Sequence, residues 1–330
     1  MSRRILVLFA TLGVAAASAP AAIAQIPQPP APPPPPTPAA GKASFKVAGG
    51  LPTKKVRYFA RGQQVVVRGV VKPYVAGQSV TLEMVRRGKV AARRSAPVVS
   101  GKRGAGRFTM RFETKRRGRI RLVVKHAATP QQQAFRARDK RIDVVRWTAG
   151  AGAKGTHVLL MQRVLLDLGF AVPVTGYFDD GTARAITAYR KTNGMGLTGY
   201  ADAAVFDKLF RRRGAYKLRY PKSGRHVEFD WSRQVLVLAR KGRPWRVYHA
   251  SSGTPATPTV FGTFRFYLKT PGTNAKGMVD SNYFIRGYAI HGYASVPTYP
   301  ASHGCIRVPI PNARDIFDNI SIGETIYVYS

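Results

Sequence analysis

Cysteine is almost missing from this chain, whose 330 residues contain only one, Cys305. A single cysteine cannot form a disulfide within the chain, so a fold held together by internal disulfides is excluded. In an exported protein, a lone cysteine is buried and inert, pairs between two chains, or is a reactive thiol. Histidine is scarce as well, and two of its six residues, His291 and His303, closely precede the cysteine.

Acidic residues are few, with 15 Asp and Glu against 54 Lys and Arg, and the formal net charge is +39. The excess is uneven along the chain. Residues 42–146 hold 28 basic and 4 acidic side chains, a net charge of +24, whereas residues 221–330 hold 13 and 6, a net charge of +7. Most of the positive charge therefore lies outside the block that carries the cysteine. The hydrophobic content is ordinary at 45%, and the length predicts two or three domains.

Residues 1–24 have the pattern of a secretory signal peptide. Arg3 and Arg4 precede an apolar run over residues 5–19, and an A-x-A cleavage site ends at Ala24. The alternative is an uncleaved membrane anchor, but the run is rich in alanine and weakly hydrophobic for a spanning helix. We therefore expect an exported protein in the cell wall, the periplasm or the extracellular space, tethered to a membrane only if the signal stays uncleaved.

Residues 25–41 are predicted to be a proline-rich linker, with five consecutive prolines at 32–36. Such a segment cannot bury enough apolar surface to fold, and it favours a stiff polyproline II spacer. A ligand for proline-binding modules is the alternative. In an exported chain, a spacer that holds the following domains off a membrane is the better interpretation.

Residues 42–146 are predicted to form an all-β sandwich. Short segments that alternate apolar and polar residues, or that are rich in valine, are separated by turns that contain glycine. The predicted strands span residues 64–71, 79–85, 106–112 and 119–124. The segment from Pro73 to Gly77-Gln78 resembles the lead-in of bacterial immunoglobulin-like surface domains. The resemblance implies an immunoglobulin-like sandwich, and it brings no catalytic residues.

The arginines of this sandwich fall on the exposed face of alternating strands. One interpretation is an ordinary solvated face in a basic proteome. The other is electrostatic adhesion to anionic wall polymers or to anionic lipid. Nucleic acid is not expected as a partner, because the export signal places the protein away from it.

Residues 150–213 change to a helical period, and three helices are predicted. Val158, Met161, Leu165 and Leu168 share one face of the first helix, which Gly169 ends. The second and third helices are predicted over residues 180–193 and 201–210. This spacing, together with the Gly176-x-Phe178 element, resembles the peptidoglycan-binding three-helix domain. Arg190 departs from that family's usual glutamine, and a generic small helical bundle is the alternative.

Residues 221–330 return to strands. The strands are predicted over residues 226–231, 234–239, 245–250, 262–267, 288–292 and 324–329, with the first two joined as a hairpin. A short helix is predicted over residues 311–319, with a proline near its start. The strand that ends at His291-Gly292 and the segment around Cys305 both lie in this block.

The segment from Ser302 to Arg307 has the residues that thiol chemistry needs. A thiol attacks a carbonyl as the thiolate, and a free cysteine titrates near about 8.5, so an imidazole must accept the proton. Both His291 and His303 are close enough in sequence for this role, and the residues alone do not choose between them. Consecutive backbone N–H groups around Gly304 could form an oxyanion hole, and Arg307 could bind a carboxylate. Ser302 could orient a ring nitrogen or bond the local backbone.

A metal site is the main chemical alternative for these residues. One cysteine and two histidines could hold zinc with a fourth ligand. Cys305 and His303 are only two positions apart, however, and no C-x-x-C or H-x-x-E-H pattern accompanies them. We therefore expect no metal and no cofactor. A buried, inert cysteine beside unrelated histidines is a further alternative.

The same residues resemble the catalytic domain of the L,D-transpeptidase, or YkuD, family. That family's signature is a His-Gly pair followed by Ser/Thr-His-Gly-Cys-x-Arg/Asn, matched here by His291-Gly292 and Ser302-His303-Gly304-Cys305-Ile306-Arg307. Thr257-Pro258, followed by Gly262-x-Phe264, is similar to a second stretch of the family. The resemblance covers residues 222–330. The segment between His291 and Ser302 is shorter than in many members, which leaves the substrate preference open.

The resemblance implies a mechanism and a set of roles. Cys305 would be the nucleophile, His291 the general base, and His303 and Gly304 would shape the oxyanion hole. The remaining implied residues bind substrate, and they are Ser302, Arg307 and Gly292. A stem tetrapeptide would lose its terminal D-alanine to form a thioester, which an amine of another stem resolves as a 3–3 cross-link. Water as the acceptor would make the enzyme an L,D-carboxypeptidase.

Two further alternatives belong to other classes. A non-catalytic wall-binding protein would use the helical and basic domains alone. A sortase-like enzyme also uses His, Cys and Arg, but it lacks the Ser-His-Gly-Cys run found here. Peptidoglycan stem peptides are the expected substrate under the leading interpretation.

Overall fold

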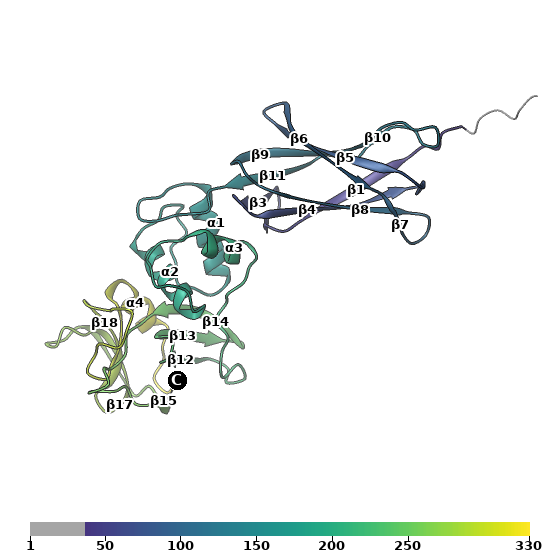
Figure 1. The fold of residues 1–330 in the computed structure, drawn as a ribbon. Coiled ribbons are helices and arrows are strands. Elements are labelled where there is room, and N and C mark those ends of the chain that lie inside the picture. Colours follow the sequence, from purple (N-terminus) through teal and green to yellow (C-terminus); the bar gives the residue numbers. More distant parts are fainter. Residues whose placement is uncertain (1–36) are drawn as a thin grey trace, which may run out of the picture. The chain divides into compact units, whose positions relative to one another are not determined.

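A computed structural model of the chain describes residues 37–330. The predicted signal peptide (1–24) and residues 25–36 of the predicted linker lie outside the described residues. Within residues 37–330, no helix is long and apolar enough to cross a bilayer. The described chain consists of a β domain, a group of three helices and a second, mainly-β part (Figure 1).

The β domain is built from two sheets that enclose one core (Figure 1). The first sheet has the order β1 (Lys42–Ala48), β4 (Gln64–Lys72), β8 (Gly106–Glu113), β7 (Val99–Ser100). The second has the order β2 (Leu51–Pro52), β3 (Arg57–Ala60), β11 (Lys140–Val145), β9 (Gly118–His126), β5 (Ser79–Arg86), β6 (Lys89–Pro97), with β10 (Phe135–Arg136) paired to β9. All strands of each sheet are antiparallel to their neighbours except β11 and β3, which pair in parallel.

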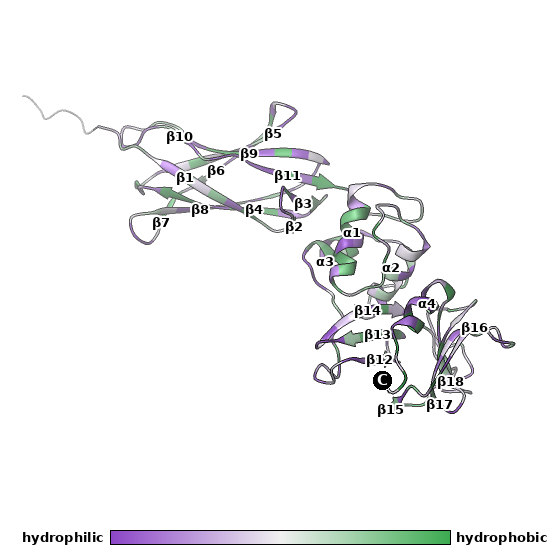
Figure 2. Ribbon diagram, turned by 180° about the vertical axis from the view of Figure 1, so that it is seen from behind, coloured by the Kyte–Doolittle hydropathy of each residue, from purple (hydrophilic) through white to green (hydrophobic). Residues whose placement is uncertain are grey.

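Alternation along the strands explains why the two sheets pack face to face. In β8, Phe108, Met110 and Phe112 are buried, and the residues between them are exposed. A period of two places all three on one face, which meets Leu82 and Leu122 of the other sheet. Figure 2 shows the alternating hydropathy along these strands. The four predicted strands are present as β4, β5, β8 and β9, while the immunoglobulin-like sandwich stays a prediction.

The three predicted helices are present as α1 (Thr156–Asp167), α2 (Asp180–Thr192) and α3 (Ala203–Phe210). Asp179 and Asp202 cap α2 and α3, accepting hydrogen bonds from the backbone N–H groups of Thr182 and Val205. Each such cap contributes about 1 kcal/mol. Gly169 ends the first helix as predicted, with a φ of 92°, where a Cβ would lie 2.8 Å from the Pro244 carbonyl oxygen.

Arg190, the departure from the family pattern, has a structural role. Its side chain is buried, and it donates hydrogen bonds to the carbonyl oxygens of Gly196 and Tyr200 and to the carboxylate of Asp202. The guanidinium therefore fixes the loop between α2 and α3. A buried charge paired in this way is stabilised by its hydrogen bonds.

The C-terminal part has two sheets and one helix. The first sheet has the order β14 (Arg243–His249), β13 (Val235–Arg240), β12 (His226–Asp230), β20 (Thr325–Tyr329), β15 (Gly262–Arg265). The second has the order β16 (Leu268–Thr273), β17 (Val279–Ile285), β18 (Tyr288–Tyr293), β19 (Ile306–Pro309), and α4 (Ile310–Asp318) packs on it. The predicted hairpin is confirmed by the antiparallel pairing of β12 and β13.

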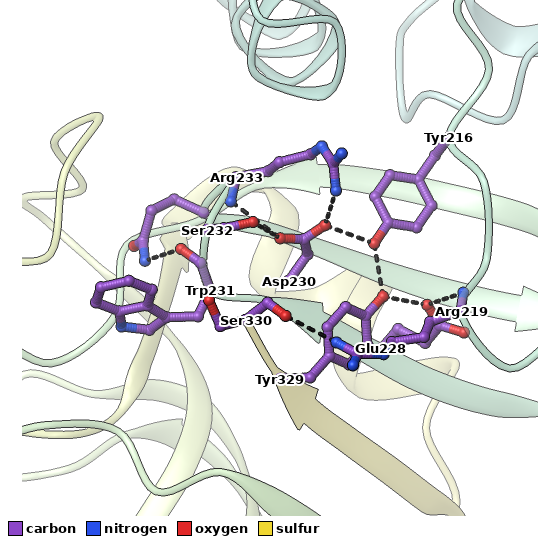
Figure 3. A network of polar contacts seen from close by, with 10 residues as sticks. Tyr216, Arg219, Glu228, Asp230, Trp231, Ser232, Arg233, Tyr329 and Ser330 are labelled. Atoms are coloured by element: carbon purple, nitrogen blue, oxygen red, sulfur yellow. Dashed lines mark hydrogen bonds and ion pairs between the residues drawn. The ribbon is translucent and has the colours of Figure 1, made fainter.

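A polar network holds the first sheet to the segment that precedes it (Figure 3). The buried carboxylates of Glu228 and Asp230 lie on β12, and Tyr216 bonds both Asp230 and Tyr329. The hydroxyl of Tyr329 donates to Glu228. Burial alone would raise the pKa of each carboxyl, but the hydrogen bonds outweigh burial and both pKa values lie below their usual range. The network is fully hydrogen-bonded, which is the condition under which buried carboxylates stabilise a fold.

Candidate active site

Parallel pairing of β18 with β19 places the two ends of the sequence motif side by side. Ile290 pairs with Ile306 and His291 with Arg307, so Cys305 lies one residue before the first paired position of β19. His291 is almost fully buried, at 3% exposure, whereas Cys305 is partly buried. The structure therefore brings together the histidine and the cysteine that fourteen positions separate in sequence.

The Cys305 thiol lies beside backbone groups of Gly287 and Ala289. Its Sγ is 3.7 Å from the Gly287 carbonyl oxygen, to which it donates a hydrogen bond. Burial raises the pKa of this thiol above its ordinary value, and the Ala289 N–H and the positive charge of Arg307 oppose the shift without cancelling it. The group is therefore a neutral thiol at rest, and it needs a base to become a nucleophile.

The His291 imidazole is held in one tautomer. Its Nδ1 lies 2.9 Å from the Gly292 carbonyl oxygen, which can only accept a hydrogen bond. Nδ1 therefore carries the proton, and Nε2 is the basic nitrogen. Burial lowers the pKa of His291 below its usual value and Arg307 lowers it further, against the opposing effect of the Gly292 carbonyl. Within residues 37–330, no hydrogen bond joins this imidazole to the Cys305 thiol at rest.

His303 differs from His291 in its surroundings. Its side chain is exposed, and it makes no hydrogen bond within the described chain. An exposed ring has no fixed tautomer or orientation. The two candidate bases that the residues alone could not separate therefore differ in burial and in tautomer, and both differences favour His291.

Gly304 occupies a backbone conformation that other residues rarely adopt. Its φ is 113°, and a Cβ at this position would lie 2.4 Å from Cε1 of Tyr288. Its N–H is already bonded to the Ser302 hydroxyl, at 3.1 Å. The backbone N–H groups of His303 and Cys305, by contrast, donate no hydrogen bond among residues 37–330. The unengaged donors beside the thiol are thus those two groups.

Ser302 is turned inward on the same segment. It is 1% exposed, and its hydroxyl donates to the Cys305 carbonyl while it accepts from the Gly304 N–H. These two bonds close a tight turn around the cysteine. The contact fits the local backbone role considered for Ser302, and its predicted contact with substrate stays a prediction.

Two threonines that precede β15 bind the backbone carbonyls of the turn formed by residues 302–305. Thr257 Oγ1 donates to the Ser302 carbonyl at 3.1 Å, and Thr259 Oγ1 donates to the Gly304 carbonyl at 2.8 Å. Thr259 also accepts from the Gly253 N–H at 2.9 Å. Thr257 was part of the Thr-Pro motif, but nothing in the sequence pattern singled out Thr259 or Gly253.

Arg307 holds the loop between the two strands. Its Nη1 donates to the Ala301 carbonyl at 3.0 Å, and its guanidinium lies 4.1 Å from the centre of the Tyr293 ring. The Tyr293 ring in turn meets the His291 ring edge to face, at 5.7 Å between centres. The arginine thus positions residues 294–302, and its predicted contact with substrate stays a prediction.

Gly292 is required by packing. A Cβ there would lie 2.7 Å from Ala313 Cβ on α4 and 3.1 Å from Val279 Cβ on β17. The glycine therefore lets α4 approach β18, and its carbonyl fixes His291. Among residues 37–330, no group of three or more His, Cys, Asp or Glu side chains could hold a metal ion.

Comparison with protein-family models gives two matches. The L,D-transpeptidase catalytic domain of the YkuD family matches residues 224–328, and a peptidoglycan-binding domain matches residues 154–209. The first match contains the whole site described above, and the second contains α1, α2 and nearly all of α3. A search of the curated proteins finds no match.

One solved structure supports the match to the L,D-transpeptidase family. An L,D-transpeptidase from Xylanimonas cellulosilytica (residues 123–326) is 30% identical, with a TM-score of 0.52, and the alignment covers 56% of this chain and 98% of that one. An L,D-transpeptidase from Stackebrandtia nassauensis is 19% identical with a TM-score of 0.35, and covers 55% and 95% of the two chains.

Proposed function

Because this chain belongs to the L,D-transpeptidase family, we propose that Cys305 is the nucleophile and His291 the general base of a peptidoglycan cross-linking reaction. The peptidoglycan-binding and catalytic domain matches support a peptidoglycan substrate. One observation carries the assignment of the base. The Gly292 carbonyl fixes the proton on Nδ1 of the buried His291, which leaves Nε2 free to accept the proton of the thiol.

The first half-reaction forms a thioester. Nε2 of His291 removes the Cys305 proton as Sγ attacks the carbonyl between the L-centre of the third stem residue and the terminal D-alanine. The C–N bond breaks, and the imidazolium returns the proton to the departing amine of D-alanine. The lowered pKa of His291 and the raised pKa of Cys305 favour the neutral pair at rest, and proton transfer then accompanies attack.

The second half-reaction transfers the acyl group. A side-chain amine from another stem attacks the thioester, His291 accepts the amine proton, and the thiolate leaves and is reprotonated. The product is an amide that joins two third-position residues. In both halves, negative charge develops on the carbonyl oxygen. The unengaged N–H groups of His303 and Cys305 are the donors that suit it, while Gly304 supplies the turn that aims them.

Product analysis tests this function. The full chain without residues 1–24 is incubated with disaccharide-tetrapeptide, and the products are identified by mass spectrometry. A dimer that lacks one D-alanine is the expected product. Loss of D-alanine without a dimer would instead assign L,D-carboxypeptidase activity, with water as acceptor. No product from folded, reduced protein, together with binding to peptidoglycan, would favour a non-catalytic wall-binding protein.

We propose that the β domain is immunoglobulin-like. Strands β1, β4, β8 and β7 in one sheet, with β11, β9 and β5 in the other, correspond to the A-B-E-D and G-F-C orders of that fold. The net charge of residues 42–146 supports an anionic partner for this domain. We also propose residues 1–24 as the export signal, in keeping with the extracellular or periplasmic location that a peptidoglycan substrate requires.

A further inference from the structure

The β domain contains a cleft that is lined mainly by lysine and arginine side chains. Its volume is about 960 Å³, and it opens between β1, the loop that precedes β3, and the chain that leads into β11. Six of its lining side chains are exposed cations without a carboxylate within 4.0 Å among residues 37–330, and they are Lys46, Lys54, Lys55, Arg138, Lys140 and Arg141. The cleft therefore concentrates charge that the fold itself does not neutralise.

The one acid in the cleft does not change this balance. Asp139 lies 3.2 Å from Arg121 and 2.8 Å from Arg136, so its charge is already paired. Six like charges around one hollow repel one another, and this repulsion opposes folding unless anions enter. A strongly positive cleft also raises the local concentration of anions and their rate of arrival.

The shape of the cleft favours a flexible anionic chain over a membrane surface as its partner. Its cations come from both sheets of the β domain and line a hollow, whereas a bilayer presents a flat surface. The only apolar aliphatic side chains in its lining are Val47 and Val56, both partly buried, and no aromatic residue lines it to insert among lipids. A flexible chain can enter a hollow that a membrane cannot, and guanidinium groups such as those of Arg138 and Arg141 bind phosphate in bidentate fashion.

We propose that this cleft binds a segment of a linear, phosphate-bearing polymer of the cell envelope. This inference rests on the proposed anionic partner of the β domain and is independent of the chemistry at Cys305. Such binding would hold the enzyme in the wall through a site separate from its peptidoglycan-binding helices.

The test compares two triple variants of the full chain without residues 1–24. The cleft variant is Lys54→Gln, Lys55→Gln, Lys140→Gln. The control, Lys72→Gln, Lys89→Gln, Lys102→Gln, removes the same charge from exposed lysines outside the cleft. The probe is inorganic polyphosphate, and affinity is measured from 50 to 200 mM salt. We expect the cleft variant alone to lose affinity about tenfold, with a shallower salt dependence.

Two results would overturn the proposal. Equal losses in the two triple variants would mean that the net charge acts as a diffuse field. Tighter binding to phosphatidylglycerol vesicles than to polyphosphate, with the same dependence on the cleft lysines, would assign a membrane. Turnover of soluble muropeptide is measured on the same preparations, so that failure of the polymer site is distinguished from failure of the transpeptidase assignment.

A second and independent observation concerns a buried lysine between the helices and the catalytic sheet. Lys191 on α2 is 6% exposed, and its Nζ donates to the carbonyl oxygens of Gln234 at 3.1 Å and Ala250 at 2.9 Å. Burial lowers its pKa to about 7. The helix packs against β14 and β13 (Figure 1), and Val235 and Val247 of those strands share the helical core.

The two carbonyls that Lys191 binds belong to a chain of contacts that reaches the cysteine. The side-chain amide of Gln234 makes two hydrogen bonds with Ser252. Its Nε2 donates to the Ser252 hydroxyl, and its Oε1 accepts from the Ser252 N–H, both at 2.8 Å. The Ser252 carbonyl accepts from the N–H groups of Ala301 at 2.8 Å and Ser302 at 2.9 Å. Ser302 closes the turn that carries Cys305.

We infer that Lys191 is a positioning residue for the catalytic cysteine, supplied by the helical domain. The ammonium fixes Gln234, which precedes β13, and Ala250, which follows β14. These two residues position Ser252, whose carbonyl holds the Ser302 turn. The peptidoglycan-binding domain is on this view part of the catalytic unit as well as an anchor. A misplacement of about 1 Å at a reacting group can reduce the rate by roughly a hundredfold, so a modest loosening would be measurable.

Lys191→Met in the full chain without residues 1–24 tests this inference, with Arg184→Ala as the matched control. Arg184 is also on α2, and it bonds Asn312 on α4 at 3.1 Å without reaching the Ser302 turn. We expect Lys191→Met to lower kcat about tenfold with KM within about twofold, and to change the rate of Cys305 alkylation by iodoacetamide. Arg184→Ala is expected to leave both unchanged.

Lys191→Gln separates loss of the hydrogen bonds from loss of folding. Its side-chain amide can still donate a hydrogen bond, so its kcat is expected to lie between those of Lys191→Met and the wild type. Thermal unfolding is recorded for every variant. Wild-type kcat and alkylation in folded Lys191→Met would overturn the inference. An equal fall in Arg184→Ala would do so too, since it would show that general docking of α2 matters and this lysine does not.

Discussion

Nδ1 of His291 lies 2.9 Å from the carbonyl oxygen of Gly292, the next residue in the chain. The bond fixes the tautomer of His291, the proposed base, through a main-chain atom that no substitution at position 292 removes. Replacement of Gly292 is excluded for another reason, because α4 packs against its Cα. The same dipeptide therefore orients the imidazole of His291 and lets α4 pack closely on β18.

The first prediction concerns pH. Burial, with Arg307, lowers the pKa of His291, and burial raises that of Cys305. A base must be unprotonated to act, so a lowered pKa moves the acid limb of kcat/KM below the ordinary histidine value of about 6.5. We expect the acid limb of kcat/KM for the donor muropeptide to lie below about pH 6.5. An acid limb of kcat/KM above pH 7 would contradict the lowered pKa of His291.

The second prediction separates the two histidines. His291→Ala should lower the rate of thioester formation by roughly 10² to 10⁴, the usual contribution of a general base. His303→Ala should change it by less than about tenfold, because the exposed ring of His303 holds no partner within the described chain. Acylation is followed by intact-protein mass spectrometry. Comparable losses in both variants would mean that the ring of His303 also takes part.

The third prediction concerns Gly304. Gly304→Ala combines a φ of 113° with a Cβ placed 2.4 Å from Tyr288, so strain and overlap act together. We expect a loss of roughly 1–3 kcal/mol in unfolding free energy and a large loss of acylation, because the turn that carries the thiol must move. Gly323→Ala is the control, since its φ is 84° but nothing lies within 4 Å of a Cβ there. If the two variants behave alike, close packing on Tyr288 is not what requires glycine.

Much of this architecture follows from local pattern. The alternation in β8 and the helical period of α1 predicted both elements, because each buries one face and solvates the other. Some strands that do not alternate apolar and polar residues, such as β6, were not predicted from the sequence. Every residue of β6 except Ala96 is exposed, so no burial pattern marks it. The motif singled out Cys305 and His291, the proposed nucleophile and base, because the chemistry needs those residue types.

The supporting groups could not be predicted in the same way. Ser302 and Arg307 carry polar groups that could face substrate, and only the fold shows that they bond their own loop. Thr259 acts across 45 positions and Lys191 across 59, and such contacts depend on how sheets and helices pack. The local sequence pattern around Thr259 and Lys191 therefore does not indicate these long-range contacts. The choice between His291 and His303 likewise required burial, which the motif does not contain.

The last prediction concerns acid stability and the network of Figure 3. Hydrogen bonds hold the pKa values of Glu228 and Asp230 below those of the unfolded chain, which are about 4.3 and 3.9. A carboxyl with a depressed folded pKa stabilises the fold above its unfolded pKa, and this stabilisation disappears as pH falls through the folded value. The stability that these two carboxyls contribute should therefore stay level from neutral pH to about pH 5 and disappear in stronger acid, and it is read as the difference in melting temperature between the wild type and Tyr329→Phe.

Tyr329→Phe tests the network directly, since it removes the hydroxyl that bonds Glu228 and Tyr216. A buried acceptor left without its partner costs about 1–3 kcal/mol, so we expect a lower melting temperature at pH 7 and a smaller further drop in acid. Tyr327→Phe, on the same strand, removes only an exposed bond to Ser223 and should change neither value. If Tyr329→Phe keeps the full acid dependence of the wild type, this hydroxyl does not depress the carboxyl pKa values, and the backbone N–H groups and His226 account for the shift on Glu228.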